Sequence, residues 1–119
     1  MIDRLDQMLR FQSEALKLRS QRQELLAANI ANADTPQYKA VDIDFAQALA
    51  DATSPEGDAA KTARSSTVLY RVPGQPSLDG NTVEMDVERA QFADNTVRYE
   101  AALRVLNAQI KAMLAVLQG

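Results

Sequence analysis

Two stretches with the hydrophobic spacing of a helix lie at the ends of this chain, and the spacing fails between them. The first stretch, about residues 2–32, contains no proline or glycine and is rich in residues that favour helices. Its apolar side chains recur every three or four positions, which predicts a helix that buries one stripe. Gln12, Arg19 and Gln23 interrupt this stripe, which indicates packing against several neighbours rather than one partner.

The second stretch, about residues 87–118, has the stronger pattern, because seven of the nine positions in its heptad frame are apolar or aromatic. Asp86 is expected to cap this helix at its start. The residues predicted to pack between helices or between subunits are Leu5, Leu9, Leu26, Ile30, Phe92, Tyr99, Leu103, Leu106, Ile110, Met113 and Leu117.

The segment between the two helices follows neither the helix period nor the strand period for long. Residues 51–66 (DATSPEGDAAKTARSS) are small, polar and punctuated by proline and glycine, so we expect a flexible linker. Residues 67–72 (TVLYRV) are the strand candidate. An ordered loop and a short β-ribbon are both compatible with this composition.

The predicted fold is therefore mainly α, with residues 1–33 and 86–119 pairing as a coiled-coil-like hairpin. Residues 34–50 form a turn and a docking segment, and residues 51–85 form a flexible or β-containing middle. Two long helices bury little surface within one short chain. We therefore expect other subunits to supply the rest of the core.

Composition narrows the range of functions. The formal charge is −3 and no basic face is evident, so nucleic-acid binding is not expected. The chain has no cysteine and no histidine, and it therefore lacks thiol nucleophiles, disulfides and Cys/His metal sites. No window approaches 18 consecutive apolar residues, so membrane insertion is not expected. Residues 1–10 lack the pattern of a signal peptide, which indicates the cytoplasm or export without a cleaved signal.

Close groups of carboxylates are the remaining candidates for chemistry, namely Asp3 with Asp6, Asp42 with Asp44, and Glu84 with Asp86 and Glu88. Asp42 and Asp44 lie in an alternating VDIDF run, so we expect them to share one solvent-exposed face. The third group, Glu84 with Asp86 and Glu88, lies at a helix start, where acidic side chains complement the helix dipole. The sequence predicts no catalytic site, no metal site and no cofactor.

Residues 26–45 (LAANIANADTPQYKAVDIDF) contain more polar residues than the end of a helix requires, since one asparagine or glycine would be enough to end it. The segment resembles the N-terminal signature of bacterial flagellar basal-body rod and hook proteins. That signature has an Ala-Asn-apolar-Ala-Asn core, then threonine, a short turn, and an aromatic residue followed by a basic one. The signature residues here are Ala28, Asn29, Ile30, Ala31, Asn32, Thr35, Pro36, Tyr38 and Lys39.

Residues 78–119 continue this resemblance, and the short chain is most similar to the proximal rod members of the family. The resemblance implies a structural subunit whose terminal helices pair into an inner domain. Copies would stack helically into a hollow shaft that crosses the periplasm, transmits torque and conducts exported subunits. The implied partners are copies of the chain, adjacent rod proteins, an adaptor to the membrane ring and, in transit, the flagellar type III export gate. The resemblance also implies export without a cleaved signal.

Within such a shaft, the signature is interpreted as an assembly junction. Asn29 lies one turn inside the helix on the same side as Asn32, and we expect it to hydrogen-bond to a neighbouring subunit and fix the register. The polar positions Gln12, Arg19 and Gln23 are expected to face the central channel or adjacent subunits.

Phe45 and Leu49, in the run FAQAL, lie one helical turn apart. The spacing alone favours a short amphipathic turn that packs on the long helices. The resemblance implies a second interpretation, a docking motif for the export gate. The alternative function for the whole chain is a small secreted helical-hairpin binding protein or a secretion chaperone.

Overall fold

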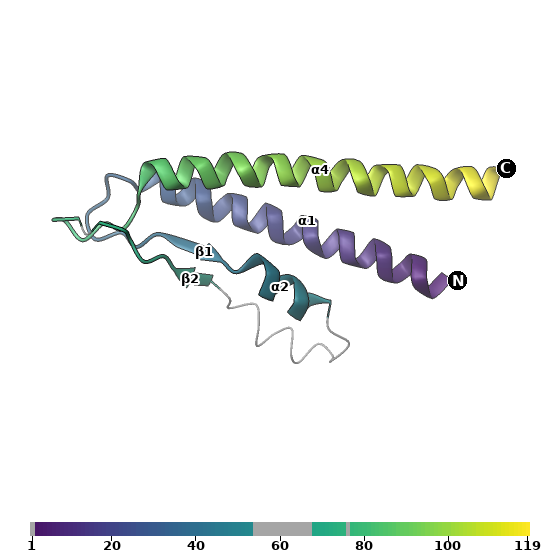
Figure 1. The fold of residues 1–119 in the computed structure, drawn as a ribbon, viewed down its shortest axis with the longest axis horizontal. Helices are drawn as coiled ribbons and strands as arrows, with labels where there is room; N and C mark the ends of the chain where they lie inside the picture. Colours follow the sequence, from purple (N-terminus) through teal and green to yellow (C-terminus); the bar gives the residue numbers. More distant parts are fainter. Residues whose placement is uncertain (1, 54–67, 76) are drawn as a thin grey trace.

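The fold is a pair of long helices with a small β-ribbon and a short helix along one side, as the computed structural model shows (Figure 1). The structure describes residues 2–53, 68–75 and 77–119. The elements in chain order are α1 (Ile2–Ala31), β1 (Val41–Ile43), α2 (Phe45–Ala52), β2 (Val68–Tyr70) and α4 (Met85–Gln118).

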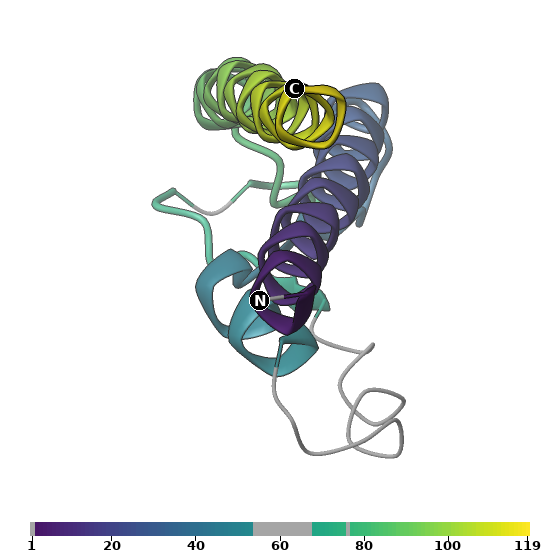
Figure 2. The same cartoon turned by 90° about the vertical axis from the view of Figure 1, so that its right-hand side faces the viewer.

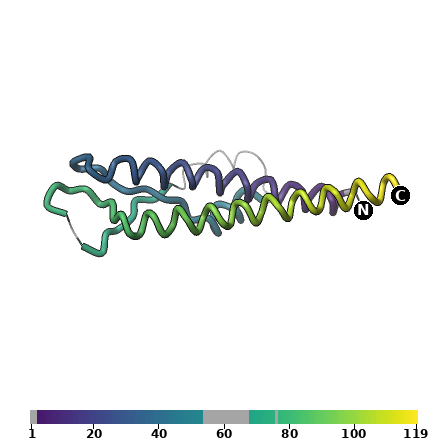
Figure 3. Tube along the Cα trace, turned by 90° about the horizontal axis from the view of Figure 1, so that it is seen from above, coloured from purple at the N-terminus to yellow at the C-terminus, as the bar shows by residue number. Residues whose placement is uncertain are grey.

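The helices α1 and α4 run antiparallel, so the two termini lie at the same end of a molecule 63 Å long (Figures 1 and 3). The ribbon and α2 lie along one side of the helix pair and contact α1 (Figures 1 and 2). The predicted mainly α hairpin is confirmed. No helix in the described part of the chain combines the length and the apolar content that crossing a bilayer requires.

Helix α1 ends at the signature, as the sequence predicts. The Asn32 N–H donates to the Ala28 carbonyl at 3.0 Å, and the Asn32 side-chain amide donates to the same carbonyl at 2.8 Å. The side chain therefore adds a second hydrogen bond to a carbonyl of the last turn that already accepts a backbone N–H. Pro36, a few residues on, disfavours helical geometry at Thr35.

Helix α4 begins at Met85, one residue before the expected cap. The prediction that Asp86 caps the helix is wrong, because Asp86 lies inside the first turn and Glu84 holds the cap position. Glu84 makes no side-chain cap bond, and its carboxylate instead accepts the Gly74 N–H at 2.6 Å. This bond ties the loop after β2 to the start of α4.

The middle of the chain contains a β-ribbon, one of the two possibilities that the sequence allowed for this segment. Strands β1 and β2 pair antiparallel, with Val41 opposite Tyr70 and Ile43 opposite Val68. The Arg71 N–H continues the ladder by donating to the Ala40 carbonyl at 2.9 Å. The strand prediction for residues 67–72 is therefore confirmed, over a shorter range.

The predicted short amphipathic turn is helix α2. Asp44 caps it by accepting the Gln47 N–H at 3.2 Å. The expected linker at residues 51–66 is wrong at its first two positions, because Asp51 and Ala52 continue α2. Residues 54–66 of that prediction lie outside the described residues.

The stripe predicted for α4 is only half right. One column of it is half-buried against α1, namely Phe92, Tyr99, Leu106 and Met113. The other column, Leu103, Ile110 and Leu117, stays exposed. A neighbouring column of α4 is more covered instead, namely Glu88, Asn95, Ala102 and Gln109. Counting apolar residues misses Glu88 and Asn95 because polar side chains can be buried when they are paired.

On α1 the predicted stripe agrees better with the structure. Leu26 is fully buried, Leu9 and Ile30 are half-buried, and Leu5 near the free end is exposed. The core is therefore concentrated at the end of the hairpin where the signature lies.

Candidate functional site

A cluster of buried and half-buried polar side chains lies where the ribbon meets both long helices. We call it the polar junction, and its members are Arg22, Asn29, Asp42, Arg71 and Glu88. They come from α1, β1, the residue after β2, and α4. The junction thus connects four segments that are far apart in the sequence.

Asn29 is at the centre of the polar junction and is fully buried. Its side-chain amide donates to the Val41 carbonyl at 2.7 Å and to Glu88 Oε2 at 3.0 Å. Its oxygen accepts the Val41 N–H at 3.0 Å and the Tyr38 hydroxyl at 3.2 Å. These four bonds use both donors and both lone pairs of the amide.

The prediction that Asn29 bonds to a neighbouring subunit is therefore wrong. A fully buried amide with all its bonds made inside the chain has nothing left to offer a partner. The register that Asn29 fixes is internal, because it holds β1 and the signature turn against both helices. The signature residue Tyr38 shares this role through its hydroxyl group.

Glu88 is the fully buried charge of the polar junction. Its carboxylate accepts hydrogen bonds from Asn29 and from the Arg71 guanidinium. A buried carboxylate is tolerated when it is paired with a cation and hydrogen-bonded. The interpretation of Glu88 as an acid that complements the helix dipole is therefore incomplete, since its main partners are Asn29 of α1 and Arg71 just after β2.

Asp42 is held between two arginines. The Arg22 guanidinium donates from Nε to Asp42 Oδ1 at 2.9 Å and from Nη2 to Oδ2 at 3.0 Å. Arg71 also donates to Oδ2. The expectation that Asp42 and Asp44 share a solvent-exposed face is wrong, because Asp42 joins α1 to the ribbon and Asp44 caps α2.

Burial alone would raise the pKa of Asp42. The hydrogen bond from Arg22, the hydrogen bond from the Ile43 N–H and the positive charge of Arg22 act in the opposite direction and prevail. The pKa of Asp42 in the folded chain therefore lies below its ordinary value. It follows that folding favours the charged form of this carboxyl group.

Acid is therefore expected to weaken the polar junction. Because the pKa of Asp42 is lower in the folded chain, its contribution to stability is complete above about pH 4 and is lost as the pH falls through the folded pKa. Urea unfolding at a series of pH values between about 6 and 2 measures the effect. Asp42→Asn should remove this part of the pH dependence, whereas Asp34→Asn, in the exposed turn, should retain it. An unchanged pH profile in Asp42→Asn would contradict the assignment.

A second polar contact joins α1 and α4 near the middle of the hairpin. Asn95, fully buried, donates to the Arg19 carbonyl at 2.9 Å and to Gln23 Oε1 at 2.7 Å. Gln23 in turn donates to the Thr96 hydroxyl at 2.7 Å. The Arg19 guanidinium lies 3.8 Å from the centre of the Phe45 ring, a cation–π contact with α2.

Arg19 and Gln23 have partners within the chain, and their exposure to a channel or to adjacent subunits stays a prediction. Both side chains contact α4 or α2 of the same chain. Their polar atoms find partners there, so they interrupt the apolar stripe without leaving it unpaired.

The signature turn is closed by Asn81. Its side-chain amide donates to the carbonyls of Asn32, Ala33 and Thr35, at distances of 2.7–3.0 Å. These are carbonyls at and just beyond the C-terminus of α1 that no helix bond satisfies. The preceding Gly80 has a φ of 75°, a left-handed conformation that favours glycine.

The remaining signature residues lie around this turn. Lys39 donates to the Gly80 carbonyl, and Thr35 donates to Asn32 Oδ1 at 3.1 Å. Pro36 is exposed at the tip. Ala28 and Ile30 are half-buried, whereas Ala31 is exposed. The structure thus brings the polar signature residues together within one chain.

The sequence pattern alone missed five members of these contacts, namely Arg22, Arg71, Asn81, Glu88 and Asn95. A signal did exist for two of them. Glu88 and Asn95 lie seven residues apart, on the same face of α4 as Phe92 and Tyr99. In the described residues, no group of three acidic side chains is arranged to hold a metal ion.

Comparison with known proteins agrees with this architecture. The model of the family described as "Flagella basal body rod protein" matches residues 9–39, which include the end of α1 and the signature. The chain is 56% identical to the flagellar basal body rod protein FlgB of Salmonella typhimurium, with 100% of this chain and 99% of the relative covered. It is 53% identical to FlgB of Escherichia coli over the same shares and 46% identical to FlgB of Cereibacter sphaeroides, where 90% and 91% are covered. The chain belongs to the family of flagellar basal body rod proteins and, within it, to the FlgB group.

Proposed function

We propose that this chain is a structural subunit of the proximal rod of the bacterial flagellar basal body. It assembles with copies of itself and with adjacent rod proteins into a helical shaft that transmits torque and leaves a channel for exported subunits. The observation that carries this proposal is the distribution of polar and apolar contacts. The polar junction stabilises one end of the hairpin internally, while α4 keeps Leu103, Ile110 and Leu117 exposed.

Exposed apolar side chains on a long, nearly straight helix are typical of a surface that other subunits cover. A torque-bearing shaft also requires that each subunit keep its own shape under load. Salt bridges and buried hydrogen bonds that connect α1, α4 and the ribbon support that requirement. The family relationship fits a structural role rather than catalysis.

The proposal includes two more specific partners, the adaptor at the membrane ring and the type III export gate. The chain would pass through the gate without a cleaved signal. Phe45 and Leu49 are the proposed contacts with the gate. In the folded chain Phe45 lies against Arg19, and α2 packs on α1. The two side chains would therefore become available only when α2 leaves α1, before the chain is folded.

The alternative functions, a secreted hairpin binding protein or a secretion chaperone, receive no support from the relatives, which are named as rod proteins over nearly their full length. The polar signature also exceeds what an isolated helical hairpin needs for its turn.

Deletion of the gene for this chain is expected to abolish motility and to leave basal bodies without a complete rod. Complementation with a tagged copy should restore swimming, and the tag should appear in purified basal bodies at the rod when they are imaged by electron cryomicroscopy. A deletion strain that swims normally, or a complete rod in its basal bodies, would contradict the proposed function.

A further inference from the structure

The two edges of the β-ribbon differ, and the edge of β1 is closed. Strand β1 lies between α1 and β2 (Figure 1). On the α1 side, the Asn29 side-chain amide donates to the Val41 carbonyl at 2.7 Å, and its oxygen accepts the Val41 N–H at 3.0 Å. These are the two bonds that the backbone of a third strand would make there. The Asn29 side chain therefore takes the place of a strand beside β1.

The outer edge of β2 is free. The Arg71 N–H donates toward β1, to the Ala40 carbonyl at 2.9 Å, and Tyr70 lies opposite Val41. Because successive residues of a strand direct their N–H and C=O groups to opposite sides, those of Tyr70 and Val72 point away from β1. Within the described residues, no group bonds to them. Unpaired backbone groups along an edge can pair with another strand.

The side chains along this edge are apolar and exposed. Leu69, Tyr70 and Val72 are 56%, 74% and 88% exposed. The one charged residue of the segment 68–72 is Arg71, and its guanidinium is directed into the polar junction. Proteins commonly protect a free edge with exposed charged side chains, and the segment 68–72 has none. Such an edge is typical of a surface that a partner covers.

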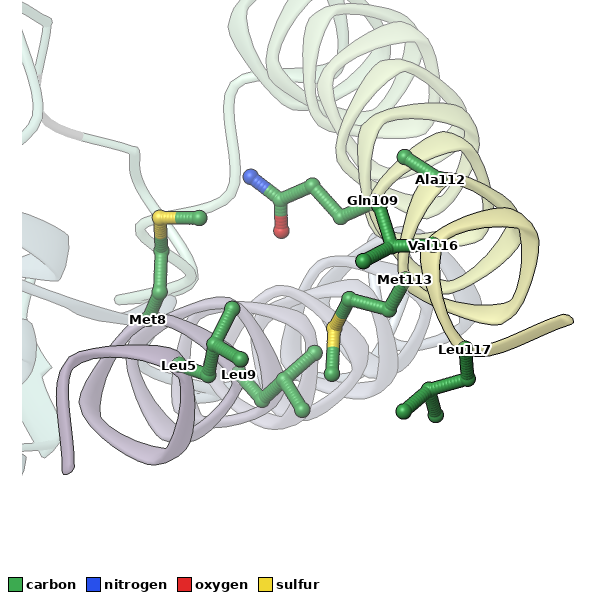
Figure 4. Close-up of a pocket in the computed structure, with 8 residues that line it drawn as sticks. All are labelled: Leu5, Met8, Leu9, Gln109, Ala112, Met113, Val116 and Leu117. Carbon is green, nitrogen blue, oxygen red and sulfur yellow. The ribbon is translucent and has the colours of Figure 1, made fainter. Parts of the chain in front are cut away.

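Apolar side chains also line a groove between the free ends of α1 and α4, among them Leu5, Met8 and Met113 (Figure 4). Contacts in such a groove are non-directional, so they do not select the conformation of an occupant. The edge of β2 is more selective. Its backbone groups require an extended chain, and its side chains require apolar partners on that chain.

A second copy of the chain does not suit the edge of β2. Within the described residues, the ribbon has one free edge, because Asn29 closes the other. Two copies would therefore pair through the same edge of each, an isologous contact that has a two-fold axis and closes into a dimer. A helical shaft is built from heterologous contacts, in which each copy meets the next through a different surface. The free edge therefore favours a partner other than the chain itself.

We propose that the edge of β2 binds an extended apolar segment of a different basal-body protein, which adds a third strand to the ribbon. This inference rests on the proposed function, which places other proteins beside the chain. The added strand bonds to the outward backbone groups of Tyr70 and Val72 and covers their side chains. Arg71 lies between these two residues and is held by Asp42 and Glu88, so the added strand is attached to the polar junction.

Photo-cross-linking in assembled basal bodies tests the occupant. A photoreactive benzoylphenylalanine replaces Val72, and mass spectrometry identifies the cross-linked peptide. We expect a cross-link to one short segment of a different protein. The same probe in place of Val97, which is 66% exposed on α4, should not reach that segment. Cross-links to a second copy alone, or none in basal bodies that contain the probe, would overturn the proposed occupant.

Hydrogen exchange of the unmodified chain distinguishes an added strand from a contact between side chains. In the isolated chain we expect fast exchange at the N–H groups of Tyr70 and Val72, and slow exchange at the Arg71 N–H, which is bonded to Ala40. In basal bodies the first two should slow by about tenfold or more, and the Arg71 N–H should stay slow. Unchanged exchange at Tyr70 and Val72 would overturn the added strand.

The failure of this inference can be distinguished from that of the proposed function. Basal bodies that contain the chain but leave the Tyr70 and Val72 N–H groups unprotected would overturn the added strand and leave the rod assignment intact. Basal bodies that lack the chain altogether would overturn the rod assignment and this inference with it. If the probe at position 72 prevents incorporation, the exchange of the unmodified chain decides.

Discussion

Asn29→Leu is expected to lower the free energy of unfolding by about 3–5 kcal/mol. Leucine has a branched shape like that of asparagine but is larger and makes none of its four hydrogen bonds. The Val41 N–H and carbonyl then lose their side-chain partner, and the buried Glu88 keeps its charge with one hydrogen bond fewer. Total stability of a small domain is about 5–15 kcal/mol, so the loss is a large fraction of it.

Urea unfolding followed by circular dichroism measures this change as a lower midpoint. The matched control is Asn107→Leu, the same substitution at an exposed position of α4, which should change the free energy by less than about 0.5 kcal/mol. If Asn29→Leu unfolds at the same urea concentration as the parent chain, the central position of Asn29 in the polar junction is wrong.

Ile110→Asp is expected to abolish rod assembly and motility while leaving the single chain folded. Ile110 is 40% exposed, so the isolated hairpin accommodates an aspartate there. In an assembled rod the same position would bury an unpaired charge, which costs several kcal/mol at each repeated contact. Leu106→Asp should also abolish assembly, and it should destabilise the single chain as well because Leu106 is half-buried.

Swimming in soft agar and imaging of purified basal bodies measure the effect, and circular dichroism of the purified chain confirms the fold. Ala108→Asp, which places the same charge on another exposed position of α4, is the matched control and should swim. Normal motility of Ile110→Asp would refute the assignment of this face to subunit contacts.

Periodicity was sufficient to predict the hairpin because long helices repeat their pattern many times. Both helices and the turn at Asn32 to Pro36 lie where the sequence places them. The pairing of β1 with β2 was harder to predict from the sequence. The Val41–Ile43 segment is three residues long and pairs with Val68–Tyr70, and so short a run carries little periodic signal.

The polar junction could not be predicted for a different reason. Asp42 and Glu88 read as surface acids, since a local pattern does not reveal which cation lies across the fold. Their arginine partners are 20 and 17 residues away, and one of them follows a strand that had no predicted partner. Long-range pairing of polar groups depends on the tertiary arrangement, and that arrangement decided the role of Asn29 as well.

The two ends of the hairpin differ in what joins them, and this difference has a mechanical consequence. At one end, charged and hydrogen-bonded contacts clamp four segments, and such contacts resist shear because they depend on direction. At the other end, the described residues of the two helices meet through non-directional apolar contacts, so the arms can spread or close by small amounts at little cost. The subunit is therefore stiff at the end that holds the polar junction and compliant at the end where α1 begins and α4 ends. Such a subunit suits a position in which the compliant end meets neighbours of more than one kind while the stiff end carries the load.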